Sequence, residues 1–326
     1  MRTKERAELR GQILEGQYRV DQCIGVGGTG VVFAATRLDA EGPERHVVVK
    51  TMRPIFVDNA DLRRRLRREA EVAYTVPHPG VVPVIDEGTL SDGSPFIVME
   101  RVYGLALNRL LLREGVLPPQ EVAAIAMRVA AILHSVHGKG YVHRDVKPEH
   151  VLLQQNGRGA LEVVLLDFGV CAADTAPLEE RDRERGRVFG TPTYVSPEQA
   201  TGNPDVDARA DVYGLGVVMF ECLTGRAPFT ARNVASLLRR IIREDPPRVA
   251  LLAPQVDRQL DAVIARAMAR DARHRFPSAR AFARALAPHA ADRWETEREL
   301  LSRVAQARPL AKGNEEPTLS PKDAAA

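Results

Sequence analysis

The stretch YVHRDVKPEHVLL, residues 141–153, places a run of polar residues between two apolar ends. An aspartate in such a loop, here Asp145, can accept the proton of a hydroxyl group. Further along the chain, the apolar run LEVVLL, residues 161–166, ends in a second aspartate, Asp167. A carboxylate that follows a buried strand is a suitable oxygen ligand for Mg²⁺. The two motifs in this order indicate a site that combines a base with a metal ion.

A glycine-rich segment, GVGGTGVV at residues 25–32, lies upstream between two runs with strand character. Glycines at this spacing allow backbone N–H groups to approach phosphate oxygens, because no Cβ stands in the way. A dinucleotide-binding fold requires a helix directly afterwards, whereas VVFAATRL, residues 31–38, has the pattern of a strand. We therefore expect a phosphate-binding hairpin, and a glycine-rich turn without a ligand remains the alternative.

Lys50 ends the strand-like run HVVVK, residues 46–50, whose central members favour burial. A lysine there can contact two phosphate groups, and it also needs an anionic partner. Glu69, in the helical pattern of residues 58–75, lies one turn from apolar Leu66 and is a candidate partner. The alternatives are a lysine at the surface end of a strand and a glutamate in a surface salt bridge.

The pattern of the sequence changes along its 326 residues, a length that usually supports two lobes or domains. From residue 18 to 99, short β-branched runs are interrupted by one helical stretch, which predicts an antiparallel sheet with one helix. From about residue 105 the apolar spacing lengthens to the helical period, which predicts a mostly helical second part. One more amphipathic stretch follows residue 290, and the final segment has little to bury and is expected to be disordered.

The composition argues against several classes of protein. The net charge is only +3, and the densest basic run, residues 63–71, has the pattern of a helix face, so no nucleic-acid partner is expected. No run of eighteen or more apolar residues occurs, and the charged N-terminus lacks an apolar export signal, so no membrane partner is expected. Three cysteines without CxxC spacing argue against a disulfide framework and favour the reducing cytoplasm.

Three further motifs follow in order, GTPTYVSPEQ at 190–199, DVYGLG at 211–216 and RHRF at 273–276. Together with the motifs above, they resemble those of the eukaryotic-type serine/threonine protein kinase family, including its bacterial Hanks-type members, over residues 18–288. The resemblance implies an α+β, bilobal protein-kinase fold, with an antiparallel-sheet N-lobe that carries one helix and a mainly helical C-lobe. The implied boundaries are a charged N-terminal extension (1–17), the N-lobe (18–99), a hinge (100–103), the C-lobe (104–288), an amphipathic helix (289–307) and a disordered tail (308–326).

The resemblance also implies an activity, the transfer of the ATP γ-phosphoryl group to Ser and Thr hydroxyls of protein substrates, with Mg²⁺. Asp145 would orient and deprotonate the hydroxyl, Asp167 would bind the Mg²⁺ that bridges the β- and γ-phosphates, and Lys147 would offset developing charge and favour Ser/Thr over Tyr. Lys50 would hold the α- and β-phosphates while paired with Glu69. The implied ATP-binding residues are Ile24, Gly25, Val26, Gly27, Gly28, Thr29, Gly30, Val32, Lys50, Glu69, Glu100 and Val102.

The sequence departs from the family pattern at His150, where the family carries an Asn that binds a second Mg²⁺. Imidazole is a nitrogen ligand, better suited to Mn²⁺ than to Mg²⁺. Two functions follow from this departure. The first is an active kinase in which His150 is a metal ligand and Mn²⁺ is preferred. The second is a pseudokinase, an ATP-binding or scaffolding module that has lost turnover.

The segment between Asp167 and Thr191 is the second departure, because Thr175 is the only hydroxyl residue inside it. Phosphorylation in the middle of this segment is therefore unavailable. Its acidic residues would instead offer fixed negative charge to Arg144, and a solvated loop of mixed charge is the alternative. These acidic residues are Glu179, Glu180, Asp182 and Glu184.

Further expectations concern structural pairs and partners. The resemblance implies that Glu198 and Arg275 form an internal salt bridge and that Thr191 helps to position Asp145. An active enzyme is expected to phosphorylate itself, as a homodimer, at Thr318 or Ser320 in the accessible tail.

Overall fold

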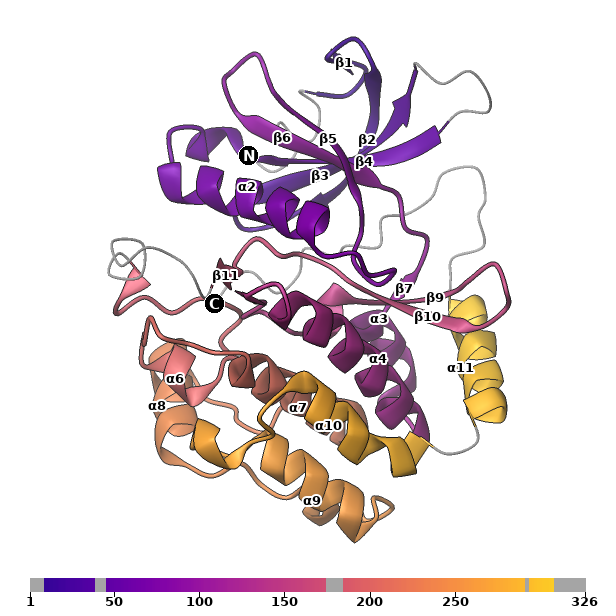
Figure 1. Cartoon of the computed structure of the whole chain (residues 1–326), viewed down its shortest axis with the longest axis vertical. Helices are drawn as coiled ribbons and strands as arrows, with labels where there is room; N and C mark the ends of the chain where they lie inside the picture. Colours follow the sequence, from indigo (N-terminus) through magenta and orange to yellow (C-terminus); the bar gives the residue numbers. More distant parts are fainter. Residues whose placement is uncertain (1–8, 39–44, 174–183, 291–292, 308–326) are drawn as a thin grey trace. The chain divides into compact units, whose positions relative to one another are not determined.

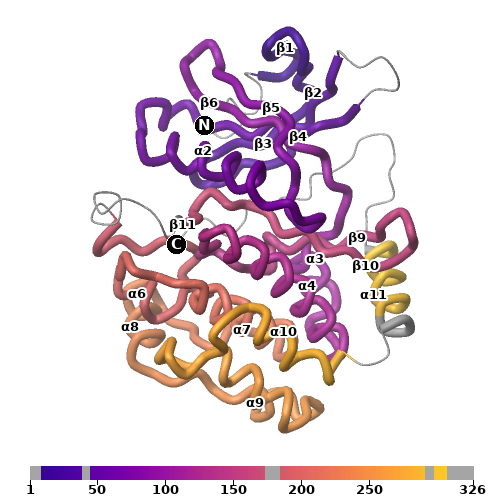
Figure 2. The backbone as a smooth tube through the Cα atoms, viewed as in Figure 1, coloured from indigo at the N-terminus to yellow at the C-terminus, as the bar shows by residue number. Residues whose placement is uncertain are grey.

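The computed structural model describes residues 9–38, 45–173, 184–290 and 293–307. The chain forms two compact units, whose elements are traced in Figures 1 and 2. The first unit holds the described residues up to Pro77 together with Val82–Gly104. The second holds His78–Val81 and the described residues from Leu105 onward.

A six-stranded antiparallel sheet, in the order β1-β2-β3-β4-β6-β5, forms most of the first unit (Figure 1). In β2, buried Tyr18 and Val20 alternate with exposed Arg19, because successive side chains of a strand point to opposite faces. The sequence pattern predicted every strand except the two-residue β1. The strands are β1 (Ile13–Leu14), β2 (Tyr18–Val26), β3 (Gly30–Arg37), β4 (Arg45–Met52), β5 (Val84–Thr89) and β6 (Pro95–Glu100).

One α-helix, α2 (Ala60–Thr75), belongs to the same unit, as predicted. It begins after Asn59, whose side chain accepts a hydrogen bond from the backbone N–H of Leu62 and so caps the first turn. Its inner face buries Leu66 and Glu69. The apolar residues of that face pack on the sheet. Glu69 is the buried charged residue among them, and its partner is described with the candidate active site.

The second unit is mainly helical and is built around α7 (Arg209–Thr224). This helix is apolar on nearly all sides and contacts α4, α9 and α10, as expected for a helix in the centre of a core. The other α-helices are α3 (Leu107–Glu114), α4 (Pro119–His137), α6 (Pro197–Ala200), α8 (Val234–Arg243), α9 (Arg258–Ala267), α10 (Ala279–Leu286) and α11 (Arg293–Ala307). Short 3₁₀ turns are η1 (Pro54–Phe56) in the first unit and η2 (Pro148–His150), η3 (Val249–Leu251), η4 (Ala272–His274) and η5 (Ala287–Ala290) in the second.

Small sheets carry the polar loops of the second unit. Strands β9 (Val151–Gln155) and β10 (Leu161–Leu165) form an antiparallel hairpin in which Val151 pairs with Leu165. Strand β7 (Leu105–Ala106) extends this sheet beside β9, and β8 (Tyr141–Val142) pairs with β11 (Ala172–Ala173). Beyond the hairpin, the N–H of Leu166 donates to the carbonyl of His150 at 2.8 Å. The hairpin thereby brings the two polar loops of the sequence together at its open end.

Helix α11 lies outside the core helices and contacts α3, α4, β9 and β10. Leu300, Leu301 and Val304 are buried on its inner face. None of the helices in the described ranges combines the length and apolar character needed to cross a bilayer.

Candidate active site

Lys50 and Glu69 form an ion pair inside the first unit. Lys50 lies on β4, between Val32 of β3 and Ile97 of β6, and its Nζ is 2.8 and 2.7 Å from the two carboxylate oxygens of Glu69. The Glu69 side chain is only 7% exposed. The expected pairing is therefore present, and neither side chain is the surface residue of the alternative interpretation.

The glycine-rich segment forms the turn between β2 and β3. The N–H of Gly27 donates to the carbonyl of Gly30 at 2.9 Å, which closes the turn. A Cβ on Gly30 would stand 3.1 Å from the carbonyl oxygen of Thr51, so this position tolerates little beyond glycine. A Cβ on Gly28 would meet no atom within 4 Å. The tip of the turn is open, as a loop that approaches a ligand requires.

The other residues expected to bind ATP lie on the same hairpin and at the end of β6. Ile24 is buried in β2, Val26 and Val32 are half-buried, and Glu100 is the exposed last residue of β6, two positions before half-buried Val102. Thr29 is exposed at the turn. All of them belong to the first unit.

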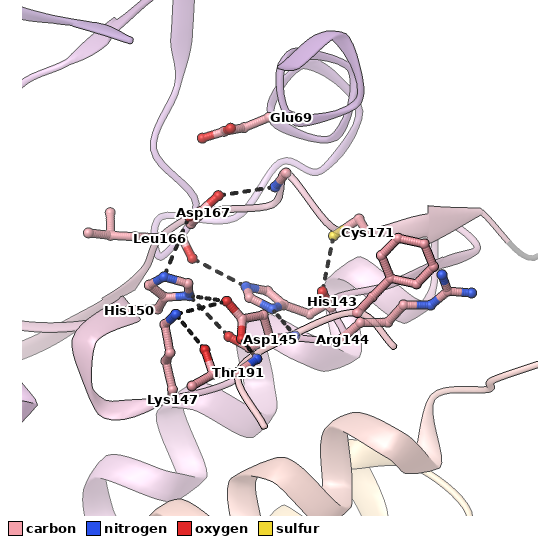
Figure 3. A network of polar contacts seen from close by, with 12 residues as sticks. Glu69, His143, Arg144, Asp145, Lys147, His150, Leu166, Asp167, Cys171 and Thr191 are labelled. Atoms are coloured by element: carbon pink, nitrogen blue, oxygen red, sulfur yellow. Dashed lines mark hydrogen bonds and ion pairs between the residues drawn. The ribbon is translucent and has the colours of Figure 1, made fainter. Parts of the chain in front are cut away.

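Asp145 lies in the loop after β8 and is held by two neighbours in the second unit (Figure 3). One carboxylate oxygen accepts the backbone N–H of Thr191 at 2.7 Å, and the other is 3.0 Å from Nζ of Lys147. Lys147 also donates to the hydroxyl of Thr191 at 2.7 Å. The three residues form a closed network that fixes the orientation of the carboxylate.

The environment of Asp145 keeps its carboxylate ionised. Burial by itself would raise the pKa of Asp145, but the positive charges of protonated His150 and of Lys147 outweigh burial, so that the pKa lies below its ordinary value. At physiological pH, where His150 is neutral, Lys147 is the cation beside this carboxylate. An ionised carboxylate with a fixed orientation can accept a proton from a hydroxyl group.

His150 ends the η2 turn and faces both aspartates (Figure 3). Its Nδ1 lies 3.0 Å from the carbonyl oxygen of Asp145, and its Nε2 lies 3.5 Å from a carboxylate oxygen of Asp167. Because a carbonyl oxygen only accepts, Nδ1 carries the proton and Nε2 presents a lone pair towards Asp167. Burial lowers the pKa of His150 to about 4, so that the ring is neutral at physiological pH.

Asp167 follows β10 with a backbone φ of 64°, a conformation that few residues other than glycine adopt. One of its carboxylate oxygens accepts the N–H of Gly169 at 3.2 Å, and its side chain is 42% exposed. Backbone strain of this kind is maintained at sites where a side chain must point in one direction. Here it presents an accessible carboxylate beside Nε2 of His150.

A family model described as "Protein kinase domain" matches residues 18–286 of the chain. The chain belongs to the protein kinase family. Curated relatives of the kinase are named as serine/threonine kinases. Serine/threonine-protein kinase pkn3 of Myxococcus xanthus is 34% identical over 288 residues, which cover 86% of this chain and 51% of that protein. Serine/threonine-protein kinase PknD of Mycobacterium tuberculosis is 37% identical over 267 residues, 81% of this chain and 38% of that protein.

Solved structures of a protein kinase domain are similar to this chain. The crystal structure of the Mycobacterium tuberculosis PknI kinase domain is 30% identical, with a TM-score of 0.66, and the match covers 86% of this chain and all of that one. The predicted protein-kinase fold is confirmed, with an antiparallel-sheet unit and a helical unit. The kinase spans about half or less of the length of the two curated relatives.

Asp211 is a functional residue of the kinase to which the sequence analysis assigned no role. It lies in the apolar helix α7 and is 1% exposed. Its carboxylate accepts the backbone N–H groups of His143 and Arg144, both at 2.8 Å, and contacts Nε2 of His137 at 2.7 Å. Asp211 therefore fixes the backbone of the loop that carries Asp145. The signal in the sequence was the acidic residue at the start of the DVYGLG motif, in a mostly apolar helix.

Arg144 of the kinase pairs with Glu184, one of the acidic residues expected to face it. The guanidinium Nη1 is 2.6 Å from a carboxylate oxygen of Glu184, and the Arg144 side chain is only 5% exposed. The N–H of Gly186 donates to the carbonyl of Gly202 at 2.9 Å, which ties the same segment to the residues after α6. Thr175, Glu179, Glu180 and Asp182 lie outside the described residues.

The predicted salt bridge between Glu198 and Arg275 is confirmed. Two guanidinium nitrogens of Arg275 lie 2.7 and 2.8 Å from the two carboxylate oxygens of Glu198. Arg275 is buried, and it also donates to the carbonyls of Ala269, Arg209 and Arg270. The pair is a structural connection within the second unit.

The residues at the open end of the hairpin fit a divalent cation only in part. Asp167 offers a carboxylate and His150 offers a neutral imidazole nitrogen, so the pair suits a metal that accepts both oxygen and nitrogen. Within the described ranges, no group of three or more His, Cys, Asp or Glu residues is arranged to hold a metal ion. The remaining ligands of a bound cation would have to come from nucleotide phosphates and water.

Proposed function

We propose that the chain is an active serine/threonine protein kinase, which transfers the γ-phosphoryl group of ATP to Ser and Thr hydroxyls of proteins. The observation that carries the proposal is the network of Asp145, Lys147 and Thr191, in which an ionised carboxylate is oriented next to a cation. The names of its relatives support the same class of substrate. Serine and threonine hydroxyls are favoured over tyrosine because of Lys147, the cation expected in kinases of this class.

In the proposed reaction, Asp145 accepts the proton of the substrate hydroxyl as the oxygen forms its bond to the γ-phosphorus. The bond between that phosphorus and the β–γ bridging oxygen breaks, and ADP leaves with the electron pair. Lys147 lies beside Asp145 and would offset the negative charge that develops on the transferring group. Such positioning and charge stabilisation account for most of the catalysis in phosphoryl transfer.

The first unit would bind the nucleotide. We assign contacts with the phosphates to Lys50, oriented by Glu69, and to the backbone of the open turn at Gly27 and Gly28. Glu100 and Val102 would offer backbone groups to the adenine ring. ATP and a divalent cation are the general requirements of the family.

Asp167 and His150 would hold the cation, which supplies positive charge to the β- and γ-phosphates when it is bound. Because one of these ligands is nitrogen, we propose that Mn²⁺ supports the reaction better than Mg²⁺. The neutral ring and its unprotonated Nε2 are the support for His150 as a ligand.

The competing function is a pseudokinase, which His150 in place of Asn favours. The test is transfer from radiolabelled ATP to a generic basic protein, with Asp145→Asn as the control. Label that depends on Asp145 supports the active kinase. Wild type that binds ATP but transfers no label, with either Mg²⁺ or Mn²⁺, supports the pseudokinase.

We further propose that the kinase acts in the cytoplasm and phosphorylates itself as a homodimer. Cys23, Cys171 and Cys222 form no disulfide with one another, and cysteines kept reduced suit the cytoplasm. Thr318 and Ser320 are the expected self-phosphorylation sites, and mass spectrometry of protein incubated with ATP tests them. Active protein with unmodified tail peptides would contradict this assignment.

A further inference from the structure

Helix α11 begins after the last residue matched by the family model, yet it is packed into the second unit. Both views place it beside β9 and β10 (Figures 1 and 2), and it contacts α3, α4 and both strands. Leu300 is fully buried and Val304 is 2% exposed. A helix with this much buried apolar surface is part of the unit that it covers.

Three ion pairs connect α11 to its neighbours. Arg303 pairs with Glu121 of α4, which is almost fully buried, and lies 3.8 Å from Glu114 of α3. Nearer the start of α11, Glu297 pairs with Arg128 of α4. The Glu297 side chain is 11% exposed and that of Arg128 is 28% exposed, so these charges are largely shielded from solvent.

Arg128 connects this ion pair to the hairpin. While one nitrogen of its guanidinium contacts Glu297, its Nε donates to the carbonyl of Leu161, the first residue of β10, at 3.2 Å. A second nitrogen donates to the carbonyl of Ala124 on α4 itself. Glu297 therefore fixes the guanidinium in the orientation that anchors β10 to α4.

The anchored strand leads directly to the candidate metal ligands. Leu166, whose N–H bonds to His150, lies five positions after Leu161, and Asp167 is the next residue. The β9–β10 pairing is regular along its whole length, so a displacement at the anchored end is transmitted to the open end.

We infer that Arg128, oriented by Glu297 of α11, is a positioning residue for Asp167 and His150, and that α11 is thereby part of the catalytic unit. The inference rests on the proposed function for its catalytic consequence. Its structural content, the anchoring of β10 by an arginine that α11 orients, is independent of that function.

The test uses the 326-residue chain, three variants and one control variant. Glu297→Ala removes the partner of Arg128, and Glu297→Asp retains its charge. The double variant R128E/E297R restores an ion pair between α4 and α11, but the carboxylate that it places on α4 has no N–H to donate to Leu161. Exposed Glu244, which pairs with Arg240 on α8, supplies the control variant Glu244→Ala.

Two quantities are measured for each variant, together with the thermal midpoint of unfolding. The first is amide hydrogen exchange of peptides covering residues 161–168, measured without metal or nucleotide. The second is the Mn²⁺ concentration that gives half-maximal phosphoryl transfer. We expect Glu297→Ala to speed exchange and to raise the half-saturating concentration by about three- to tenfold, the range typical of networks that support a site. Glu297→Asp and Glu244→Ala should leave both within about twofold of wild type.

The double variant separates positioning from simple stabilisation. We expect it to recover the thermal midpoint lost in Glu297→Ala, while exchange of residues 161–168 stays fast and half-saturation stays high. Recovery of all three quantities would overturn the inference, as would unchanged exchange in Glu297→Ala. An inactive wild type contradicts the proposed function instead, and the exchange measurement still decides whether Arg128 anchors β10.

Discussion

At the scale of single residues, His150 has an environment that only the fold reveals. An unperturbed histidine titrates near a pKa of about 6.5. Burial in the second unit lowers the pKa to about 4, and a carbonyl oxygen fixes the proton on Nδ1. The departure from Asn therefore introduces a neutral imidazole rather than a cation.

The first prediction concerns stability as a function of pH. The unfolded chain binds a proton at His150 below about pH 6.5, whereas the folded chain binds it only near pH 4, so falling pH favours the unfolded state between these values. From pH 7.5 to pH 5, His150 should reduce the free energy of unfolding by about 2 kcal/mol. Urea unfolding at the two pH values, without metal, measures this loss in wild type and in His150→Asn. Equal losses in the two proteins would contradict the buried, neutral ring.

The second prediction concerns the choice of metal. With Asn at position 150, an amide oxygen replaces the imidazole nitrogen, and Mg²⁺ prefers oxygen. We expect H150N to raise Mg²⁺-supported transfer by roughly tenfold and to narrow the preference for Mn²⁺, and H150A to lower Mn²⁺-supported transfer. Steady-state rates over a range of metal concentrations provide the comparison. A Mn²⁺ to Mg²⁺ ratio that is the same in wild type and H150N would show that His150 is not a ligand.

The third prediction concerns Lys50. Lys50→Met should reduce transfer by about 100-fold or more, because a charge aimed at the phosphates is lost. It also leaves Glu69 buried without its lysine, which should cost about 1–3 kcal/mol of unfolding free energy. The double variant K50M/E69Q removes both charges, so it should regain stability and remain inactive. Rate assays and denaturant unfolding check the two effects, and transfer that survives Lys50→Met would remove Lys50 from the site.

At the scale of elements, the segment 184–190 is held by contacts that need no phosphate. Arg144 is paired with Glu184, and Gly186 is tied to Gly202 by a backbone hydrogen bond. A carboxylate that is already in place offers the fixed negative charge that phosphorylation would otherwise supply.

The fourth prediction follows from this pairing. Phosphatase treatment should leave activity unchanged, and Glu184→Gln should lower it by about tenfold, because nearly buried Arg144 loses its anionic partner. Glu244→Gln, at an exposed ion pair on α8, is the matched control and should have no effect. Initial rates before and after dephosphorylation give the answer. A large loss on dephosphorylation would mean that a phosphate, rather than Glu184, supports the segment.

At the same scale, the length of an element decides whether the sequence pattern predicts it. Strands β2 to β6 of the first unit and helix α2 were predicted because they are long enough to show a period. The two-residue strands β1, β7, β8 and β11 were not predicted individually, since alternation cannot be recognised in so few residues. The apolar spacing predicted a mostly helical second part, which includes α7, but not that Asp211 accepts hydrogen bonds from residues distant in the sequence. The α11 stretch was recognised as amphipathic, whereas its docking on β9 and β10 depends on tertiary packing.

At the scale of the whole molecule, the two units carry different parts of the chemistry. The first holds Lys50 and Glu69 with the open glycine turn, and the second holds Asp145, Lys147 and the candidate metal ligands Asp167 and His150. The predicted pairing of Lys50 with Glu69 is confirmed by their contact, whereas the catalytic and metal-binding roles of Asp145, Lys147, His150 and Asp167 stay predictions. The candidate site residues of each unit are already ordered by contacts within that unit, as a catalytic site requires before its substrates bind.

The most direct test of the central claim is phosphoamino-acid analysis of a generic basic protein after incubation with the kinase, radiolabelled ATP and Mn²⁺. Asp145→Asn, which keeps the size of the side chain and removes its basicity, is the control. The account predicts label on phosphoserine and phosphothreonine with wild type, no label on phosphotyrosine, and a loss of at least about 100-fold with Asp145→Asn. Equal labelling by wild type and Asp145→Asn, or no labelling by wild type that binds ATP, would contradict it.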